Sequence, residues 1–82
     1  MKKLVSLFVP AISQSFDLFV PFDLEISKLI PVLTEAVETL SDNLYIQSGE
    51  ELLCSADKSI VFLGCLCLDS YSIHHGEHLV LL

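Results

Sequence analysis

The sequence contains no arginine and no tryptophan. Its only basic residues, Lys2, Lys3, Lys28 and Lys58, face eleven acidic ones, which gives a formal net charge of −7 at pH 7. Lysine and arginine supply most of the nonspecific affinity of proteins for nucleic acid, because they neutralise phosphates. We therefore expect neither nucleic acid nor an anionic membrane surface as a partner. Basic protein surfaces suit such a chain better.

Paired cysteines and long hydrophobic runs are also lacking. The three cysteines, Cys54, Cys65 and Cys67, are an odd number, whereas a secreted disulfide scaffold normally carries an even one. We expect free, buried thiols in a reducing cytosol. The longest run without charge extends only from residue 4 to residue 16, which is too short to cross a bilayer. The sequence thus predicts a cytoplasmic protein without membrane insertion.

The amino terminus imitates a secretory signal, because Lys2 and Lys3 precede the apolar stretch Leu4–Ile12. Ser6 and Pro10 interrupt that stretch, however, and no cleavage site of the A-x-A kind follows. We expect the segment to be retained as a strand.

A chain of 82 residues with 52% hydrophobic residues is expected to form one domain, over residues 1–82, with a core of its own. Alternation and short apolar runs predict five strands, at Leu4–Val9, Phe16–Val20, Leu52–Ala56, Ile60–Leu63 and His78–Leu82. Turn residues predict turns at Pro10–Ser15 and Ala56–Ser59. The segment Leu44–Gly49 is expected to be a connection, and Gly64–Ser72 an irregular segment that crosses to the last strand. With one helix after the second strand, this order predicts an α+β fold, a β-grasp whose mixed sheet of four or five strands carries the helix on one face.

The helix is predicted from Ile26 to Leu40 by an apolar stripe at three- and four-residue steps, and Ser41-Asp42-Asn43 is expected to end it. Pro31 lies inside this stripe. Proline deletes one backbone hydrogen bond, so we expect either a kink or a later start capped by Ser27.

The last third of the chain resembles a known fold family. Leu68-Asp69-Ser70-Tyr71-Ser72-Ile73, followed by Leu79-Val80-Leu81, is similar to the end of ubiquitin-like domains. Three further pieces resemble the YukD/EsaB type of small bacterial ubiquitin-like proteins. They are Phe16-Asp17-Leu18, Ile26 with Lys28-Leu29-Ile30, and an ending of the form I-x-x-G-[DE]-x-L built on Ile73, Gly76-Glu77 and Leu79. Glu25 stands where that family often has a proline.

This resemblance implies an accessory or regulatory cytoplasmic protein of type VII secretion systems in Gram-positive bacteria. It would act by contact with protein components of the machinery, a membrane-embedded subunit among them, without a cofactor and not as an enzyme. The sequence does not fix the oligomeric state, and a homodimer stays open. Because the sequence ends at Leu82 within its last predicted strand, without a Gly-Gly tail, we expect neither conjugation nor sulfur-carrier activity.

A small metal- or thiol-binding protein is the alternative function. The residues concerned are Cys65, Cys67, His74, His75 and His78, with Glu77 beside them, which are side chains that zinc accepts. Their spacing does not favour a site, since zinc cysteine pairs usually have two to four intervening residues and this pair has one. We expect His74-His75-Gly76 to form a tight turn in which Gly76 takes a positive φ.

Two surfaces are candidates for partner binding. If Phe16, Leu18 and Val20 face the helix, Phe19 points outward, with Phe22 just beyond the strand, and the uncovered sheet face could expose both. The same two side chains could instead cover the hairpin edge or pack under a loop. The second surface consists of the acidic residues Glu35, Glu38 and Asp42 on the helix.

Overall fold

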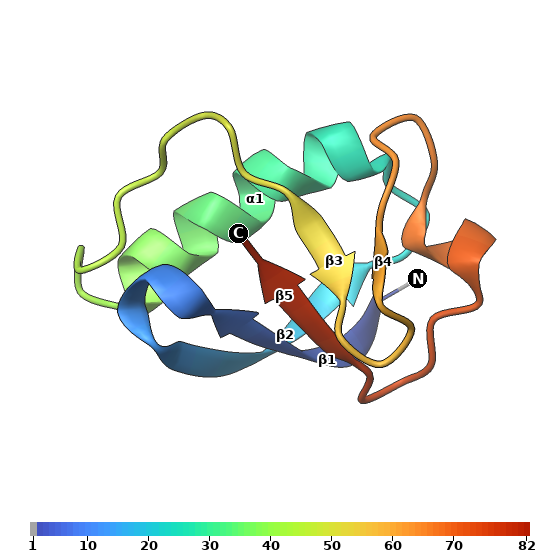
Figure 1. The fold of residues 1–82 in the computed structure, drawn as a ribbon, viewed down its shortest axis with the longest axis horizontal. Coiled ribbons are helices and arrows are strands. Elements are labelled where there is room, and N and C mark those ends of the chain that lie inside the picture. Colours follow the sequence, from blue (N-terminus) through green and yellow to red (C-terminus); the bar gives the residue numbers. More distant parts are fainter. Residues whose placement is uncertain (1) are drawn as a thin grey trace.

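The structure, a computed structural model, describes residues 2–82 (Figure 1). In chain order it contains strand β1 (Lys2–Val9), a 3-10 turn at Pro10–Ile12, β2 (Gln14–Pro21), helix α1 (Ile26–Leu40), β3 (Leu53–Ser55), β4 (Ile60–Val61), a 3-10 turn at Leu68–Tyr71, and β5 (His78–Leu81). The five strands form one sheet in the order β2-β1-β5-β3-β4. Only the central β1–β5 pair is parallel among these strands. The predicted α+β β-grasp is confirmed.

The β1–β2 hairpin shows which side of the sheet is buried. Val5, Leu7 and Val9 of β1 are buried, and register places Leu18 of β2 beside Val5 and Phe16 beside Leu7. Side chains of neighbouring residues in register point to the same face of a sheet, and side chains alternate along each strand. Phe16 and Leu18 therefore point to the buried face, and the predicted inward face of β2 is confirmed. The alternate residues point to the other face, which α1 does not cover (Figure 1).

Helix α1 begins at Ile26, so the later start capped by Ser27 is wrong. Four of its buried residues, Ile26, Leu29, Leu33 and Val37, belong to the predicted stripe. The pattern puts Thr34 on the other side and Leu40 in the stripe, and both are wrong, since Thr34 is buried and Leu40 is exposed. No side chain caps the first turn. Instead, the N–H groups of Ile26 and Ser27 donate to the carbonyls of Leu66 (2.8 Å) and Gly64 (3.0 Å), which come from the crossing segment. This tertiary contact satisfies N–H groups that a helix start otherwise leaves without partners.

Phe22 requires a correction, because its side chain is only 1% exposed. After β2 the chain turns inward, and the crossing segment closes over this residue, with the Asp69 N–H donating to the Phe22 carbonyl at 3.1 Å. The Lys3 ammonium lies 5.0 Å from the centre of the ring. Phe22 therefore packs under a loop and offers no side chain to a partner.

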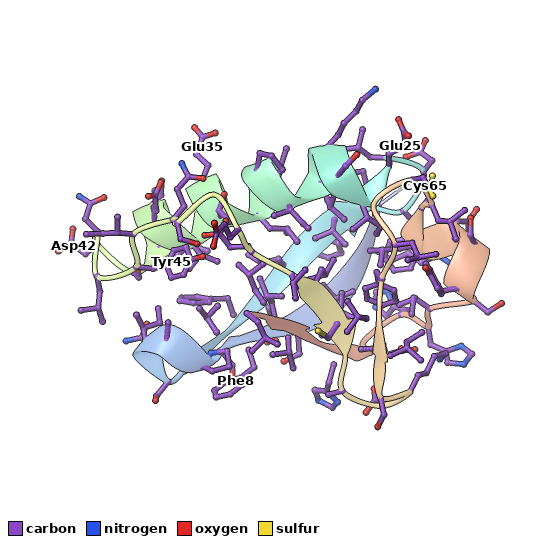
Figure 2. The ribbon with its side chains drawn as sticks, turned by 45° about the horizontal axis from the view of Figure 1, so that its top comes forward. Phe8, Glu25, Glu35, Asp42, Tyr45 and Cys65 are labelled. Atoms are coloured by element: carbon purple, nitrogen blue, oxygen red, sulfur yellow. The ribbon has the colours of Figure 1, made fainter. Side chains whose placement is uncertain are left out.

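The thiols also differ from expectation. All three cysteines are free, as predicted, but Cys65 is exposed, and Cys54 and Cys67 are only half-buried. The segment 63–67 turns its backbone toward the start of α1 to cap it, which leaves the Cys65 side chain on the outside, beside Glu25 in Figure 2.

Candidate docking surfaces

Four apolar side chains cross the open face of the sheet in one row. Phe8 lies beside Val80, Val80 beside Cys54, and Cys54 beside Val61, so the row runs through β1, β5, β3 and β4. Phe8 and Val61 are exposed, and the two central side chains are half-buried. Figure 2 shows Phe8 pointing away from the side that α1 covers. We call these four residues the open-face row. Sequence reasoning missed them because each of the four strands contributes only one.

Phe19 lies on the same face at its other end. Its side chain is 67% exposed and stands beside Leu4 of β1. Three polar residues separate this pair from the open-face row. The strand register places Asp17 of β2 beside Ser6 of β1, and Ser6 beside His78 of β5. The predicted outward orientation of Phe19 is thus confirmed, and it adds a second apolar patch to the open face.

The acidic helix residues lie on a different side of the molecule. Glu35 and Asp42 are exposed, whereas Glu38 is half-buried and accepts a hydrogen bond from the Gln47 N–H at 3.3 Å. Figure 2 shows Glu35 pointing outward from α1, away from the sheet. The two predicted surfaces are therefore separate, one apolar and one acidic.

The three histidines line a shallow surface hollow with Asp57 and Glu77, but they do not converge. Gly76 has the expected positive φ, +85°, so the turn prediction is confirmed. The Nδ1 atom of His75 accepts the Leu4 N–H at 3.3 Å, and the His78 N–H donates to Asp57 at 3.0 Å. Within residues 2–82, no group of three histidine, cysteine or acidic side chains could hold a metal ion.

Glu77 is a buried carboxylate that joins the β3–β4 turn to the start of β5. It is 5% exposed and accepts hydrogen bonds from the Ser55 hydroxyl (2.9 Å), the Lys58 ammonium (3.0 Å) and the His74 N–H (3.0 Å). Burial would raise the pKa of Glu77, but the hydrogen bonds from His74, Lys58 and Ser55 outweigh it and hold the pKa below its usual range. We call Glu77, Ser55, Lys58 and His74 the carboxylate clamp. It fixes the edge of the open face next to His78.

A five-stranded mixed sheet of this order, with one helix across it, defines a ubiquitin-like β-grasp fold. The chain is similar to the ubiquitin-like domain of EccD5 from Mycobacterium xenopi, with a TM-score of 0.84 and 18% identity over 100% of this chain and 93% of that one. It is also similar to the UBL domain of Plasmodium falciparum Dsk2, with a TM-score of 0.75 and 18% identity over 99% and 96%.

A third similar structure is the ubiquitin-like domain of the Mycobacterium tuberculosis type VII secretion system protein EccD1, with a TM-score of 0.66 and 16% identity over 100% and 98%. At these identities the likeness shows the fold. No protein-family model and no curated protein sequence matches the chain. None of the helices within residues 2–82 is long and apolar enough to span a membrane.

Proposed function

We propose that this chain is a ubiquitin-like accessory protein of a type VII secretion system that acts on the cytoplasmic side by protein–protein contact. The observation that carries the proposal is the open-face row, a set of apolar side chains on a sheet face that α1 leaves uncovered. Apolar patches of this kind on small soluble domains commonly mark sites of protein contact. Two of the similar structures are ubiquitin-like domains of EccD proteins, which supports the choice of machinery.

The partners in this proposal are protein subunits of the secretion machinery, a membrane-embedded one among them. Phe19 extends the contact along the open face, and Glu35, Glu38 and Asp42 form a second, acidic contact on α1. A regulatory effect on assembly or secretion would follow from occupancy of these surfaces. No conjugation and no catalysis enter this function. For the alternative metal- or thiol-binding function, the structure brings together no three-ligand group within residues 2–82.

A pair of valines provides a matched test. Val61 on the open face and Val32 on α1 are exposed to almost the same extent, 53% and 50%, so Val61→Asp and Val32→Asp add the same charge to opposite sides. Each variant, together with Phe19→Asp and Glu35→Lys, is expressed in the native cell. Crosslinking pull-down with quantitative mass spectrometry then measures recovery of secretion subunits, and secretion of their substrates is measured in parallel.

We expect Val61→Asp to lower recovery about tenfold or more, because a carboxylate buried without a partner costs more than about 1.4 kcal/mol of binding energy. Val32→Asp should leave recovery unchanged. Equal recovery with the two variants would overturn the open face as the contact. Failure to recover any secretion subunit with the unmodified protein would overturn the assignment to this machinery.

A further inference from the structure

A groove of about 350 Å³ lies between α1 and the segments 47–53 and 62–64. Figure 1 shows the segment that leads into β3 running beside the helix. Apolar side chains form much of its wall, among them Ile30, Pro31, Leu52 and Phe62. Leu52 is an exposed leucine, so part of this wall faces solvent. This groove lies on the helix side of the sheet and shares no lining residue with the open-face row.

One wall of the groove contains a backbone acceptor that the helix cannot satisfy. In an α-helix the N–H of residue 31 would donate to the carbonyl of residue 27, but proline has no N–H. Ser27 and Pro31 both line the groove, so this carbonyl lies between two lining residues, one turn apart on α1. One turn later, by contrast, the carbonyl of Pro31 does have a side-chain partner. The buried Thr34 hydroxyl lies 2.9 Å from the Pro31 carbonyl oxygen and 2.9 Å from the side-chain amide oxygen of Gln47. The Ser27 carbonyl thus lacks the partner that its helical position normally provides.

The only charged residue among those that line the groove is Glu51. Its carboxylate accepts hydrogen bonds from the Ser48 N–H (2.6 Å), the Tyr45 hydroxyl (2.8 Å) and the Gly49 N–H (3.1 Å). Burial would raise the pKa of Glu51, but these hydrogen bonds outweigh it and lower the pKa, so the side chain is an anion at neutral pH.

Within residues 2–82, no lysine or histidine lines this groove. Lys28, the only basic residue of α1, pairs with Glu25 at 3.3 Å and is not a lining residue. The wall thus combines apolar surface, a backbone acceptor without its helical partner and a carboxylate. A ligand that matches it brings an apolar stem, several hydrogen-bond donors and a positive charge.

We infer that this groove binds an arginine side chain that a partner protein presents between apolar residues. The guanidinium carries five N–H donors in one plane, which allows it to reach a carbonyl and a carboxylate together, and its aliphatic stem packs on apolar walls. A lysine ammonium is a single point charge and is more strongly hydrated, so it fits a partly apolar groove less well. This groove shares no lining residue with the open-face row, so either site can fail its test without the other.

The test is a titration of ¹⁵N-labelled protein with the peptide acetyl-Leu-Arg-Leu-amide, followed by NMR amide shifts. The matched probe contains citrulline in place of arginine, which keeps the shape and removes the charge. We expect saturable shifts at Ser27, Thr34 and Gln47, with about tenfold weaker binding of the citrulline peptide, since hydrogen bonds to charged groups are roughly twice as strong. Equal affinity for the two peptides, shifts confined to the open face, or no saturable shift would each overturn the inference.

Pro31→Ala tests the backbone acceptor directly. Alanine restores an N–H that the Ser27 carbonyl can accept within the helix, and it is a better helix former, so the variant should fold at least as well. We expect it to bind the arginine peptide about fivefold more weakly, by loss of roughly 1 kcal/mol for one hydrogen bond. The control is Val32→Ala, at the next position of α1, which does not line the groove. Equal binding by the two variants would contradict a role for this carbonyl.

Discussion

The carboxylate clamp allows a sharp prediction, because Glu77 is buried and supports three partners. Glu77→Ala removes the acceptor of the Ser55 hydroxyl, the His74 N–H and the Lys58 ammonium. Loss of one partner of a fully buried ion pair costs roughly 3–5 kcal/mol. The Lys58 side chain is 33% exposed and can turn to water. We therefore expect Glu77→Ala to lower the free energy of unfolding by less than a fully buried pair would, by about 2–3 kcal/mol. That is a large fraction of the roughly 5–15 kcal/mol that stabilises a small domain.

Glu77→Gln separates charge from shape. The amide retains an oxygen for the His74 N–H, so this variant should lose about 1–2 kcal/mol, which is the charge-assisted part of the clamp. Urea unfolding followed by circular dichroism measures each change as a shift in midpoint at constant slope. The control is Glu50→Ala, because Glu50 is exposed. If Glu77→Ala unfolds at the same urea concentration as this control, the clamp does not stabilise the fold.

The clamp also predicts a pH dependence. Its hydrogen bonds hold the folded-state pKa of Glu77 below the ordinary value of 4.5, so the folded protein binds this proton less readily than the unfolded chain. The contribution to stability is therefore fully present above pH 4.5 and is lost as the pH falls through the lower, folded-state pKa. Asp57 and Glu51 also have lowered pKa values, so the relevant quantity is the difference between the unmodified protein and Glu77→Gln. This difference should shrink on acidification, and a constant difference would contradict the mechanism.

Three further predictions concern single residues. Gly76→Ala should lower the free energy of unfolding by about 1–2 kcal/mol in urea unfolding, because the residue has φ +85° and alanine is strained there even though its methyl group would meet no atom. Burial and, to a smaller extent, the hydrogen bond to Glu51 raise the pKa of Tyr45 to about 12. An ultraviolet titration should therefore show one phenol that ionises near this pH, and the Tyr45→Phe variant should lack that transition. Cys65 is exposed, whereas burial raises the pKa of the Cys54 thiol, so a disulfide reagent should label Cys65 first, with Cys65→Ser abolishing the fast phase.

Periodicity made much of this fold predictable. The stripe of α1 and the alternation of β1 and β2 depend on local spacing, and both appear where the sequence indicates. The predicted strands Leu52–Ala56 and Ile60–Leu63 shorten to β3 and β4, whose bounds depend on pairing with distant segments. The ends of β3 and β4 are set by the strands with which they pair, so they cannot be predicted from local composition.

Several of the misjudged residues lie in or against the crossing segment. It covers Phe22, it replaces Ser27 as the cap of α1, and it leaves Cys65 outside. The burial of Phe22 also continues the alternation of Phe16, Leu18 and Val20, whereas the cap of α1 and the position of Cys65 have no periodic signal, because they depend on contacts between residues far apart in the chain. The candidate surfaces were predictable in part. Phe19 follows from alternation in one strand, whereas the open-face row exists only once four strands are in register.

The position of β5 has a consequence for the order of assembly. This strand comes last along the sequence, yet it lies between β1 and β3, and the two halves of the sheet meet only through it. During synthesis, the β1–β2 hairpin and the β3–β4 pair can form early, but no strand pairing joins them before β5 is available. The sheet of this domain is therefore complete only once β5 is in place, and without this strand no strand pairing would join its two halves.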